Sequence, residues 1–162
     1  MNIFRHSFAI SIANLLYFVL DAASCVKEQW GEMLLRMNLF ARRTNNQKHI
    51  HSRFSVIRFA TKGIVDIPID SGMEYHQFIA KLSDLNWLNE GSFLNTGLDA
   101  VESELKRVNN NNRKVILLIT NGKSHPDAKV DGGQLRRLSD ATGGQIYTHK
   151  MKTLENHKNA IY

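Results

Sequence analysis

The feature that most constrains this chain is an apolar run that stops abruptly at an acidic residue. Residues 15–20 (LLYFVL) are rich in β-forming side chains, and Asp21 follows them directly. Small residues then lead into a stretch with helical spacing of apolar side chains. A continuous apolar run of this length is typical of a strand buried on both faces of a parallel sheet. Because ligands bind at the carboxyl ends of such strands, Asp21 marks a candidate site.

Two further segments are expected to meet Asp21 at the same edge of the sheet. Residues 91–97 (GSFLNTG) read as a polar loop, and residues 115–122 (VILLITNG) read as a second apolar strand with a polar end. The three strand-end segments offer Asp, Ser, Thr and Asn oxygens, which are the ligands that hard cations prefer. The sequence therefore predicts an oxygen-lined site at this edge.

Composition indicates one globular domain. The chain has 162 residues, of which 43% are hydrophobic, so it can bury a sizeable core. It carries 21 Lys and Arg against 15 Asp and Glu, but the basic residues are scattered in pairs rather than gathered in a run. This pattern favours a solvated basic surface over a dedicated nucleic-acid or polyanion site. The single cysteine, Cys25, excludes an internal disulfide and a multi-cysteine metal site.

The amino terminus has two readings. Residues 1–24 carry an early Arg5, an apolar stretch and then small residues, which resembles a secretory signal peptide. The same residues supply the first strand and its carboxylate, and Asn14 interrupts the apolar run. We favour the retained strand. The stretch is too short to span a membrane.

Strand and helix patterns alternate along the chain, which predicts an α/β fold with a mostly parallel sheet covered on both faces. Pro68 places one strand at a sheet edge. Periodicity predicts helices at residues 26–44, 73–85, 96–108 and 133–142, and strands at residues 15–20, 53–60, 64–69, 115–119 and 145–148. The two most continuously apolar strands, residues 15–20 and 115–119, are expected to be adjacent, parallel and central.

This order of elements resembles that of the von Willebrand factor A domain. FVLDAASCVKEQWGEM is similar to the first strand and helix of the family, and RFSVIRFATKG to its second strand and hairpin. GSFLNTGLDAV and VILLITNGKS resemble the A domains of collagens, type VI collagen in particular. The resemblance implies a Rossmann-like open sheet with one antiparallel edge strand and helices on both faces.

The resemblance also implies a division of the chain. Residues 1–14 would be an extension or a partial signal-like segment, residues 15–148 the A-like domain, and residues 149–162 a divergent tail. The family expects a further strand and a closing helix where the tail stands, and KMKTLENHKNAIY fits neither well. A missing strand and helix would expose a sheet edge, so we expect reduced stability or pairing with another chain.

The resemblance implies a metal-ion-dependent adhesion site in which most ligands are altered. Asp21 matches the aspartate of the family's Asp-x-Ser-x-Ser pattern, but Ala23 and Cys25 replace the two hydroxyls. Leu94 stands where a liganding threonine is expected, and Asn121 replaces an aspartate. The candidate metal ligands are Asp21, Thr96 and Asn121, and the candidate ligand-binding face comprises Ser24, Cys25, Ser92, Thr96 and Asn121. We expect no cofactor, or weakly bound Mg²⁺ or Mn²⁺, because Mg²⁺ demands near-octahedral oxygen coordination.

Simpler interpretations of these residues stay open. Asp21 could be a strand-end acid that accepts backbone N–H bonds, and Asn121 with Gly122 could form an ordinary turn. Ser92 and Thr96 could be loop or helix-entry hydroxyls. An enzyme is disfavoured, because the glycine clusters of nucleotide-binding loops are absent and a Ser24 or Cys25 nucleophile would lack an orienting third residue.

The resemblance favours a non-enzymatic adhesion domain that presents its strand-end face to a protein partner in the extracellular matrix or on a cell surface. It implies an extracellular or cell-surface location, no small-molecule substrate and no direct membrane contact. One alternative is a structural or vestigial A domain within a larger secreted assembly. The other is a basic surface that binds acidic glycan or nucleic acid.

Overall fold

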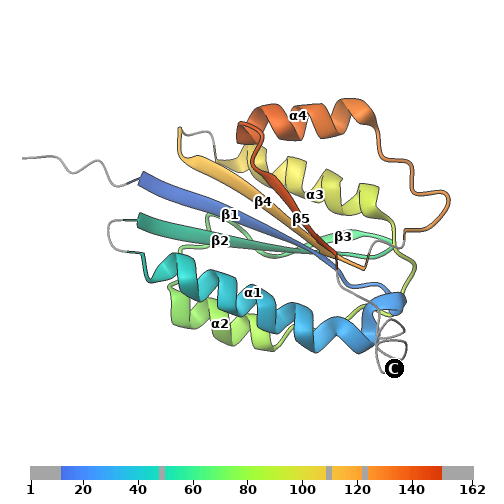
Figure 1. Ribbon diagram of the computed structural model, residues 1–162, viewed down its shortest axis with the longest axis horizontal. Helices are drawn as coiled ribbons and strands as arrows, with labels where there is room; N and C mark the ends of the chain where they lie inside the picture. Colours follow the sequence, from blue (N-terminus) through green and yellow to red (C-terminus); the bar gives the residue numbers. More distant parts are fainter. Residues whose placement is uncertain (1–11, 48–49, 109–110, 122–123, 151–162) are drawn as a thin grey trace, which may run out of the picture.

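A five-stranded sheet organises the described part of the chain. The computed structural model describes residues 12–47, 50–108, 111–121 and 124–150, and the sheet has the order β3-β2-β1-β4-β5 (Figure 1). In chain order the elements are β1 (Ile12–Asp21), the 3₁₀ turn η1 (Ser24–Gln29), α1 (Trp30–Asn45), β2 (Ile50–Phe59), β3 (Gly63–Ile67), α2 (Tyr75–Ser83), α3 (Leu94–Arg107), β4 (Arg113–Thr120), α4 (Gly132–Thr142) and β5 (Ile146–Lys150).

Strand β1 occupies the centre of the sheet, as its sequence predicts. It pairs in parallel with β2 on one side and with β4 on the other, and residues 15–20 are all buried. Strand β3 is antiparallel to β2 at the edge that Pro68 indicates. The predicted adjacency of the two most apolar strands is therefore confirmed. The segment that also resembles a signal peptide supplies this central strand.

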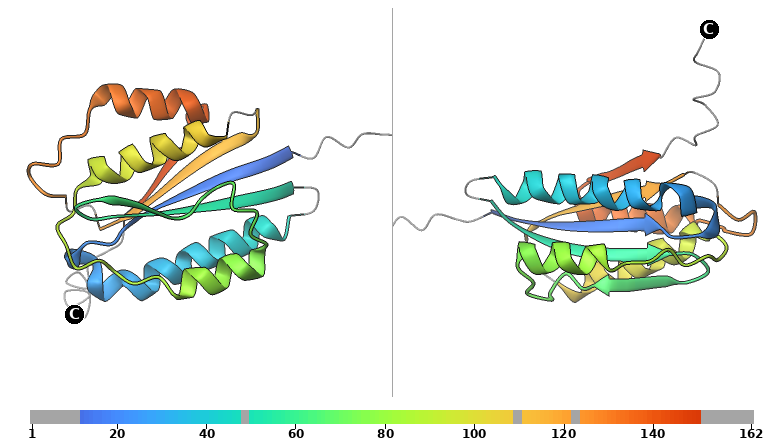
Figure 2. Two further views of the ribbon diagram at one scale, coloured as in Figure 1. Left: turned by 180° about the vertical axis from the view of Figure 1, so that it is seen from behind. Right: turned by 90° about the horizontal axis from the view of Figure 1, so that it is seen from below.

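Helices cover both faces of the sheet. Helices α1 and α2 lie on one face, and α3 and α4 lie on the other (Figures 1 and 2). The alternation of side chains along β1 divides the core accordingly: Leu16, Phe18 and Leu20 pack towards α1 and α2, whereas Leu15, Tyr17 and Val19 pack towards α3. The predicted α/β class and its single antiparallel edge strand are confirmed.

Element boundaries differ from the sequence expectations by a few residues. Helix α1 begins at Trp30 rather than Val26, because η1 makes a tighter turn over the preceding residues. Trp30 is buried as expected, and its Nε1 donates a hydrogen bond to the Leu85 carbonyl at 3.1 Å. Phe40, expected on the buried stripe of this helix, is 37% exposed. Strand β5 continues through Lys150, two residues into the segment read as a tail.

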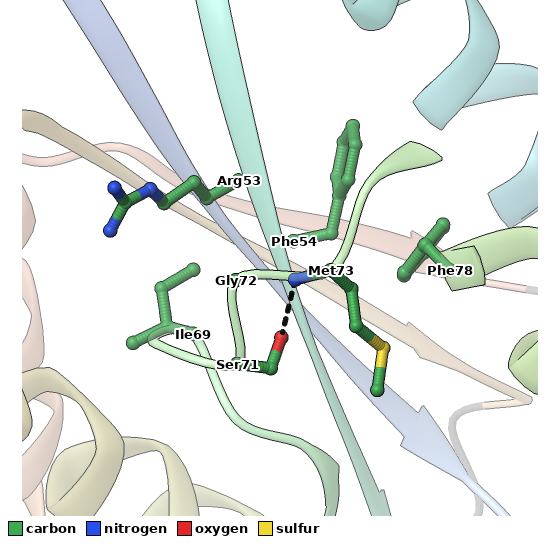
Figure 3. Close-up of a pocket in the computed structure, with 7 residues that line it drawn as sticks. All are labelled: Arg53, Phe54, Ile69, Ser71, Gly72, Met73 and Phe78. Atoms are coloured by element: carbon green, nitrogen blue, oxygen red, sulfur yellow. Dashed lines mark hydrogen bonds between the residues drawn. The ribbon is translucent and has the colours of Figure 1, made fainter. Parts of the chain in front are cut away.

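A small hollow lies at the far end of the sheet from Asp21. Its volume is about 150 Å³, and Arg53, Phe54, Met73 and Phe78 are among its lining residues (Figure 3). In the β1–β2 ladder Leu15 pairs with Arg53 and Asp21 pairs with Phe59. Six residues along a strand separate the hollow from Asp21 by roughly 20 Å. The hollow is therefore separate from the predicted site.

Candidate functional site at the carboxyl edge of the sheet

Asp21 is the centre of a hydrogen-bonded cluster at the carboxyl edge of the sheet. Its Oδ2 accepts hydrogen bonds from the hydroxyls of Ser92 at 3.2 Å and Thr120 at 2.9 Å. Its Oδ1 accepts a bond from the Ala23 backbone N–H at 3.2 Å. The end of β1, the end of β4 and the loop before α3 thus meet at one carboxylate, as their strand-end positions predict.

The electrostatics of Asp21 follow from its burial. The side chain is completely buried, and desolvation raises the pKa of its carboxyl above the ordinary value. The hydrogen bonds from Ala23, Thr120 and Ser92 favour the charged form and lower the pKa, but they offset the desolvation only in part. Three donors therefore hold a buried carboxylate, which corresponds to the simpler interpretation of a strand-end acid.

Asn121 uses its side chain to hold the neighbouring turn. The residue is buried, and its Nδ2 donates a hydrogen bond to the Cys25 carbonyl at 3.1 Å. The side chains of Ser24 and Cys25 are exposed, and the Ser24 backbone N–H donates to the Glu90 carbonyl at 2.8 Å. The end of β4 and the loop before α3 are in this way fastened to η1.

Thr96 lies outside the Asp21 cluster. Its hydroxyl, in the first turn of α3, donates to the Phe93 carbonyl at 2.8 Å and lies 3.4 Å from the Ala60 carbonyl. Leu94, expected at a liganding position, packs against the apolar core on the α3 side. Of the two hydroxyls that the sequence indicates, the structure brings Ser92 to Asp21 and leaves Thr96 with the helix.

Thr120 is the member of the cluster that sequence reasoning missed. The family pattern draws attention to Asn121, the position that differs from it, and gives no role to the residue before. Strand register places this residue: Leu20 pairs with Ile119 in the β1–β4 ladder, so Thr120 lies level with Asp21. Register between distant strands is not readable from a single sequence.

Exposed aromatic and polar side chains surround the cluster. The rings of Phe93 and His125 stack with centroids 4.5 Å apart, and the His125 backbone N–H donates to the Ser92 carbonyl at 2.6 Å. The Lys27 ammonium lies 5.1 Å from the centre of the Trp87 ring, a cation–π distance. We call the exposed residues Cys25, Lys27 and His125, together with the partly buried Trp87 and Phe93, the strand-end rim.

The residues present do not fit a divalent metal ion. The Asp21 oxygens already accept three hydrogen bonds, and the Asn121 side chain, which carries no charge, donates through Nδ2 to the Cys25 carbonyl. Ala23 and Cys25 bring no hydroxyl, and a thiol is a poor ligand for a hard cation. Within the described residues, no three His, Cys, Asp or Glu side chains are grouped so that they could hold an ion.

Comparison with known proteins places the fold. No curated protein matches the sequence. Proximal thread matrix protein 1 of the mussel byssus is similar in structure, with a TM-score of 0.67 and 17% identity over 86% of this chain and 35% of that one. BatB from Bacteroides thetaiotaomicron gives a TM-score of 0.60 and 14% identity over 84% of this chain and 64% of that one.

A third similar structure is the type V pili tip protein Mfa5 from Porphyromonas gingivalis. Its TM-score is 0.57, with 12% identity over 75% of this chain and 22% of the three-domain fragment. This chain thus spans between 22% and 64% of the lengths of these proteins.

The sequence pattern of the von Willebrand factor type A domain matches residues 16–157. The chain belongs to the von Willebrand factor type A domain family.

Proposed function

We propose that this chain is a non-enzymatic, adhesion-type domain that binds a partner protein through its strand-end rim without a metal ion. The observation that carries the proposal is the burial and hydrogen bonding of Asp21. Its carboxylate is buried and already accepts three hydrogen bonds from within the chain, which leaves little of its acceptor capacity for an ion that a partner's carboxylate could complete. Recognition then depends on the side chains around it.

The strand-end rim has the chemistry of a protein-binding surface. It combines an exposed His125 ring stacked on Phe93 with a lysine over Trp87. Aromatic side chains are enriched in protein interfaces and supply much of their binding energy. The loops that carry the rim are tied to the sheet by backbone bonds, such as Leu88 N–H to Ala22 O at 2.7 Å and Phe93 N–H to Ala60 O at 3.0 Å. A surface fixed in this way loses little entropy on binding.

The similar structures support a location outside the cell or at its surface. One belongs to a pilus tip protein and another to a thread matrix protein of the mussel byssus. We infer an extracellular or cell-surface location for this chain and a partner in the matrix or on a neighbouring surface. No helix among the described residues has the length and apolar character needed to cross a bilayer.

The arrangement of the arginines does not favour the polyanion alternative. Arg58 pairs with Asp66 at 2.6 Å, Arg107 with Asp70 at 2.9 Å and Arg137 with Glu102 at 2.9 Å. Each of these guanidinium groups is already held by a carboxylate, which reduces the positive charge available to a phosphate or sulfate chain. We therefore expect binding to a partner to change little between low and moderate salt.

Calorimetric titration with Mg²⁺ and Mn²⁺ tests the loss of metal dependence. The unmodified chain should give no binding heat, whereas the fourfold variant Ala23→Ser, Cys25→Ser, Leu94→Thr and Asn121→Asp should gain binding because it restores oxygen ligands. A threefold variant that keeps Leu94 is the matched control. It tests whether a hydroxyl at position 94 is needed when the Ser92 hydroxyl already reaches Asp21. Tight Mg²⁺ binding by the unmodified chain would refute the proposal.

Partner binding is tested with immobilised matrix proteins, in buffer containing Mg²⁺ and in buffer containing a chelator. We expect equal binding in both buffers and a loss of at least about tenfold in affinity for the double variant Trp87→Ala and His125→Ala. Arg136→Ala, on exposed α4, is the control and should bind like the unmodified chain. Binding that the chelator abolishes contradicts the proposal, and absence of binding favours a structural role.

A further inference from the structure

The small hollow beside the start of β2 forms where the chain leaves the sheet. Strand β3 pairs only with residues 56–59 of β2, and it ends at Ile67. The Ile69 backbone N–H then donates to the buried Glu104 carboxylate of α3 at 3.0 Å. In the described part of the chain, the first half of β2 therefore has no strand beside it on this side. The segment 68–73 follows β3, and a hollow of about 150 Å³ lies between it and β2 (Figure 3).

The floor of the hollow is apolar and its opening is polar. Phe54 of β2 and Phe78 of α2 are buried, and their ring centroids lie 4.7 Å apart. Arg53, Ser71 and Gly72 also line the hollow and are exposed. Gly72 has a φ of 67°, a left-handed conformation that favours glycine, so no side chain narrows the opening at this point. A small molecule in the hollow would contact both rings.

Arg53 gives the hollow a positive charge. Among the described residues that line it, no other side chain is charged. The nearby Asp70 carboxylate is held by Arg107, whose Nη2 lies 2.9 Å from each carboxylate oxygen. The Arg53 side chain is exposed and forms no ion pair or hydrogen bond within the described residues. Its guanidinium is therefore available to a carboxylate, to which it can donate two parallel hydrogen bonds.

We propose that this hollow binds a small carboxylate that carries one apolar ring or branched chain. The carboxylate pairs with Arg53 at the opening, and the apolar part lies against Phe54 and Phe78. A volume of about 150 Å³ suits a single six-membered ring, whereas drug-sized ligands need about 300 Å³ or more. A free acid and the carboxy-terminal residue of a peptide both have this chemistry. The hollow lies far from the strand-end rim, so the inference does not depend on the proposed function.

Other classes of small ligand match fewer of these features. Inorganic phosphate can pair with Arg53 but has no apolar part to contact the rings. A neutral aromatic molecule can contact the rings but makes no use of the guanidinium charge. An amine would bring a second positive charge beside Arg53 and be repelled. A carboxylate with an apolar group uses both the floor and the opening.

The test is a titration of the ¹⁵N-labelled full chain, followed through its backbone amide NMR signals. The probes are phenylacetate, its neutral analogue phenylacetamide, and inorganic phosphate. Phenylacetate should shift the amide signals of Phe54, Gly72 and Met73 with a Kd of about 1 mM, which is within reach of so small a ligand. Phenylacetamide and phosphate should each bind at least about tenfold more weakly, because each lacks one of the two contacts.

A second pair of probes distinguishes the source of the carboxylate. N-acetylphenylalanine carries the groups of a carboxy-terminal peptide residue, and N-acetylphenylalaninamide lacks the carboxylate. If N-acetylphenylalanine binds at least as tightly as phenylacetate and the amide does not, the ligand is a peptide terminus. If phenylacetate alone binds, the ligand is a free acid. Both results support the proposal.

Matched substitutions locate the site. Arg53→Gln should weaken phenylacetate binding by about tenfold and leave the weak binding of phenylacetamide unchanged. Arg113→Gln, which removes an exposed charge from the start of β4, should change neither affinity. Both substitutions alter exposed side chains, so the fold is retained.

Several results would overturn the proposal. Equal affinity for phenylacetate and phenylacetamide would show that Arg53 takes no part, and equal affinity for phosphate would show a general anion site. An equal loss of binding in Arg113→Gln would place the site elsewhere. Absence of shifts around the hollow at about 20 mM phenylacetate would show that it does not bind this class of ligand.

Discussion

At the scale of single residues, Asp21 shows how one buried side chain joins three separate segments of the fold. Its carboxylate joins β1, β4 and the loop before α3 through Ala23, Thr120 and Ser92. A buried charge is costly without hydrogen-bond partners, and these three donors offset part of the cost of burying the Asp21 carboxylate. Through these bonds the buried carboxylate holds together the segments that carry the strand-end rim.

Removing one donor should destabilise the fold. Thr120→Val keeps the shape of the side chain and the β propensity but leaves the buried carboxylate one hydrogen bond short. We expect the free energy of unfolding to fall by about 1.5–3 kcal/mol, the range for hydrogen bonds to charged groups. Thr148→Val, at an exposed position of β5, is the control and should change stability by less than about 0.5 kcal/mol. Equal stability of the two variants in urea would show that the Thr120 bond contributes nothing.

The raised pKa of Asp21 predicts a pH dependence of known sign. Between the ordinary and the raised value the folded chain binds more protons at this site than the unfolded chain does, so this contribution to stability is lost as pH rises through that window. Asp70 and Glu102, whose pKa values are lowered by Arg107 and Arg137, contribute the opposite slope. Comparison of the unmodified chain with Asp21→Asn in urea at a series of pH values isolates the Asp21 part. A difference that grows with rising pH in favour of the unmodified chain contradicts the assignment.

At the scale of elements, close backbone approach fixes how α3 meets the β2–β3 hairpin. A Cβ at Gly63 would collide with the Thr96 carbonyl oxygen, and a Cβ at Gly97 would lie 2.7 Å from the Phe59 ring. A helix can settle this close only where both residues lack side chains. This contact sets the position of the loop that carries Ser92 to Asp21.

The glycines of the chain provide a matched pair of substitutions. Gly63→Ala should lower the free energy of unfolding by about 1–3 kcal/mol, because the obstructing atom belongs to the backbone and cannot move aside. Gly31→Ala lies near the start of α1, where an added Cβ would meet nothing within 4 Å, and it should raise the free energy of unfolding by about 0.5–1 kcal/mol. Thermal unfolding of both variants checks the prediction, and a stabilised Gly63→Ala would show that α3 is free to shift.

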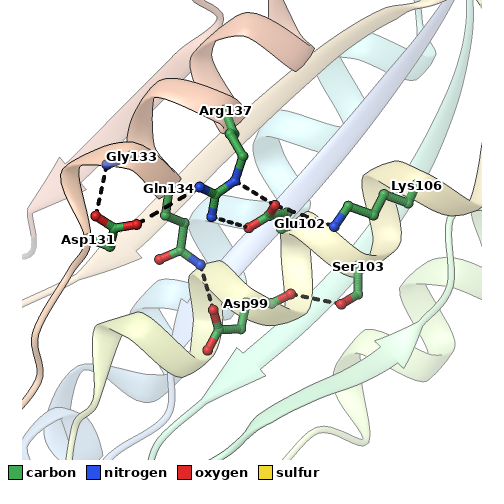
Figure 4. Close-up of polar contacts among 8 residues, drawn as sticks. All are labelled: Asp99, Glu102, Ser103, Lys106, Asp131, Gly133, Gln134 and Arg137. Carbon is green, nitrogen blue, oxygen red and sulfur yellow. Dashed lines mark hydrogen bonds and ion pairs between the residues drawn. The ribbon is translucent and has the colours of Figure 1, made fainter.

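Polar contacts join helix α4 to α3, beside the apolar packing of the buried Leu138. Arg137 Nε donates to Glu102 at 2.9 Å, and Gln134 Nε2 donates to Asp99 at 2.6 Å (Figure 4). The Asp131 side chain begins the helix by accepting from the Gly133 backbone N–H at 3.0 Å. Exposed ion pairs contribute only about 0–1 kcal/mol each, so α4 is less firmly held than α3, whose apolar face is buried.

At the scale of the whole molecule, these differences predict an order of local stability. Amide hydrogen exchange should be slowest in β1, which is paired on both sides and buried from Leu15 to Asp21, followed by β4. Exchange should be faster in the edge strands β3 and β5 of the described sheet and in α4. Exchange followed by mass spectrometry or NMR tests this order, and β5 amides as protected as those of β1 would show that another segment pairs with or covers that edge.

Much of the architecture was predictable because it depends on local patterns. The apolar runs of β1 and β4 indicated central strands, Pro68 indicated an edge, and the helical spacing along α1 indicated the burial of Trp30. Strand-end positions also predicted that Asp21 and the loop of Ser92 would meet. Each of these inferences needs only the period of the side chains and the common direction of parallel strands.

The sequence by itself determined the fold class, the order of the elements and the absence of hydroxyl side chains at positions 23 and 25. Only the tertiary structure decided that Thr120 and not Thr96 reaches Asp21, because that choice depends on register between strands about a hundred residues apart and on the first turn of α3. It also decided that Phe40 is 37% exposed rather than buried in the core. Helical spacing shows which side chains share a face, whereas burial depends on whether another element covers that face.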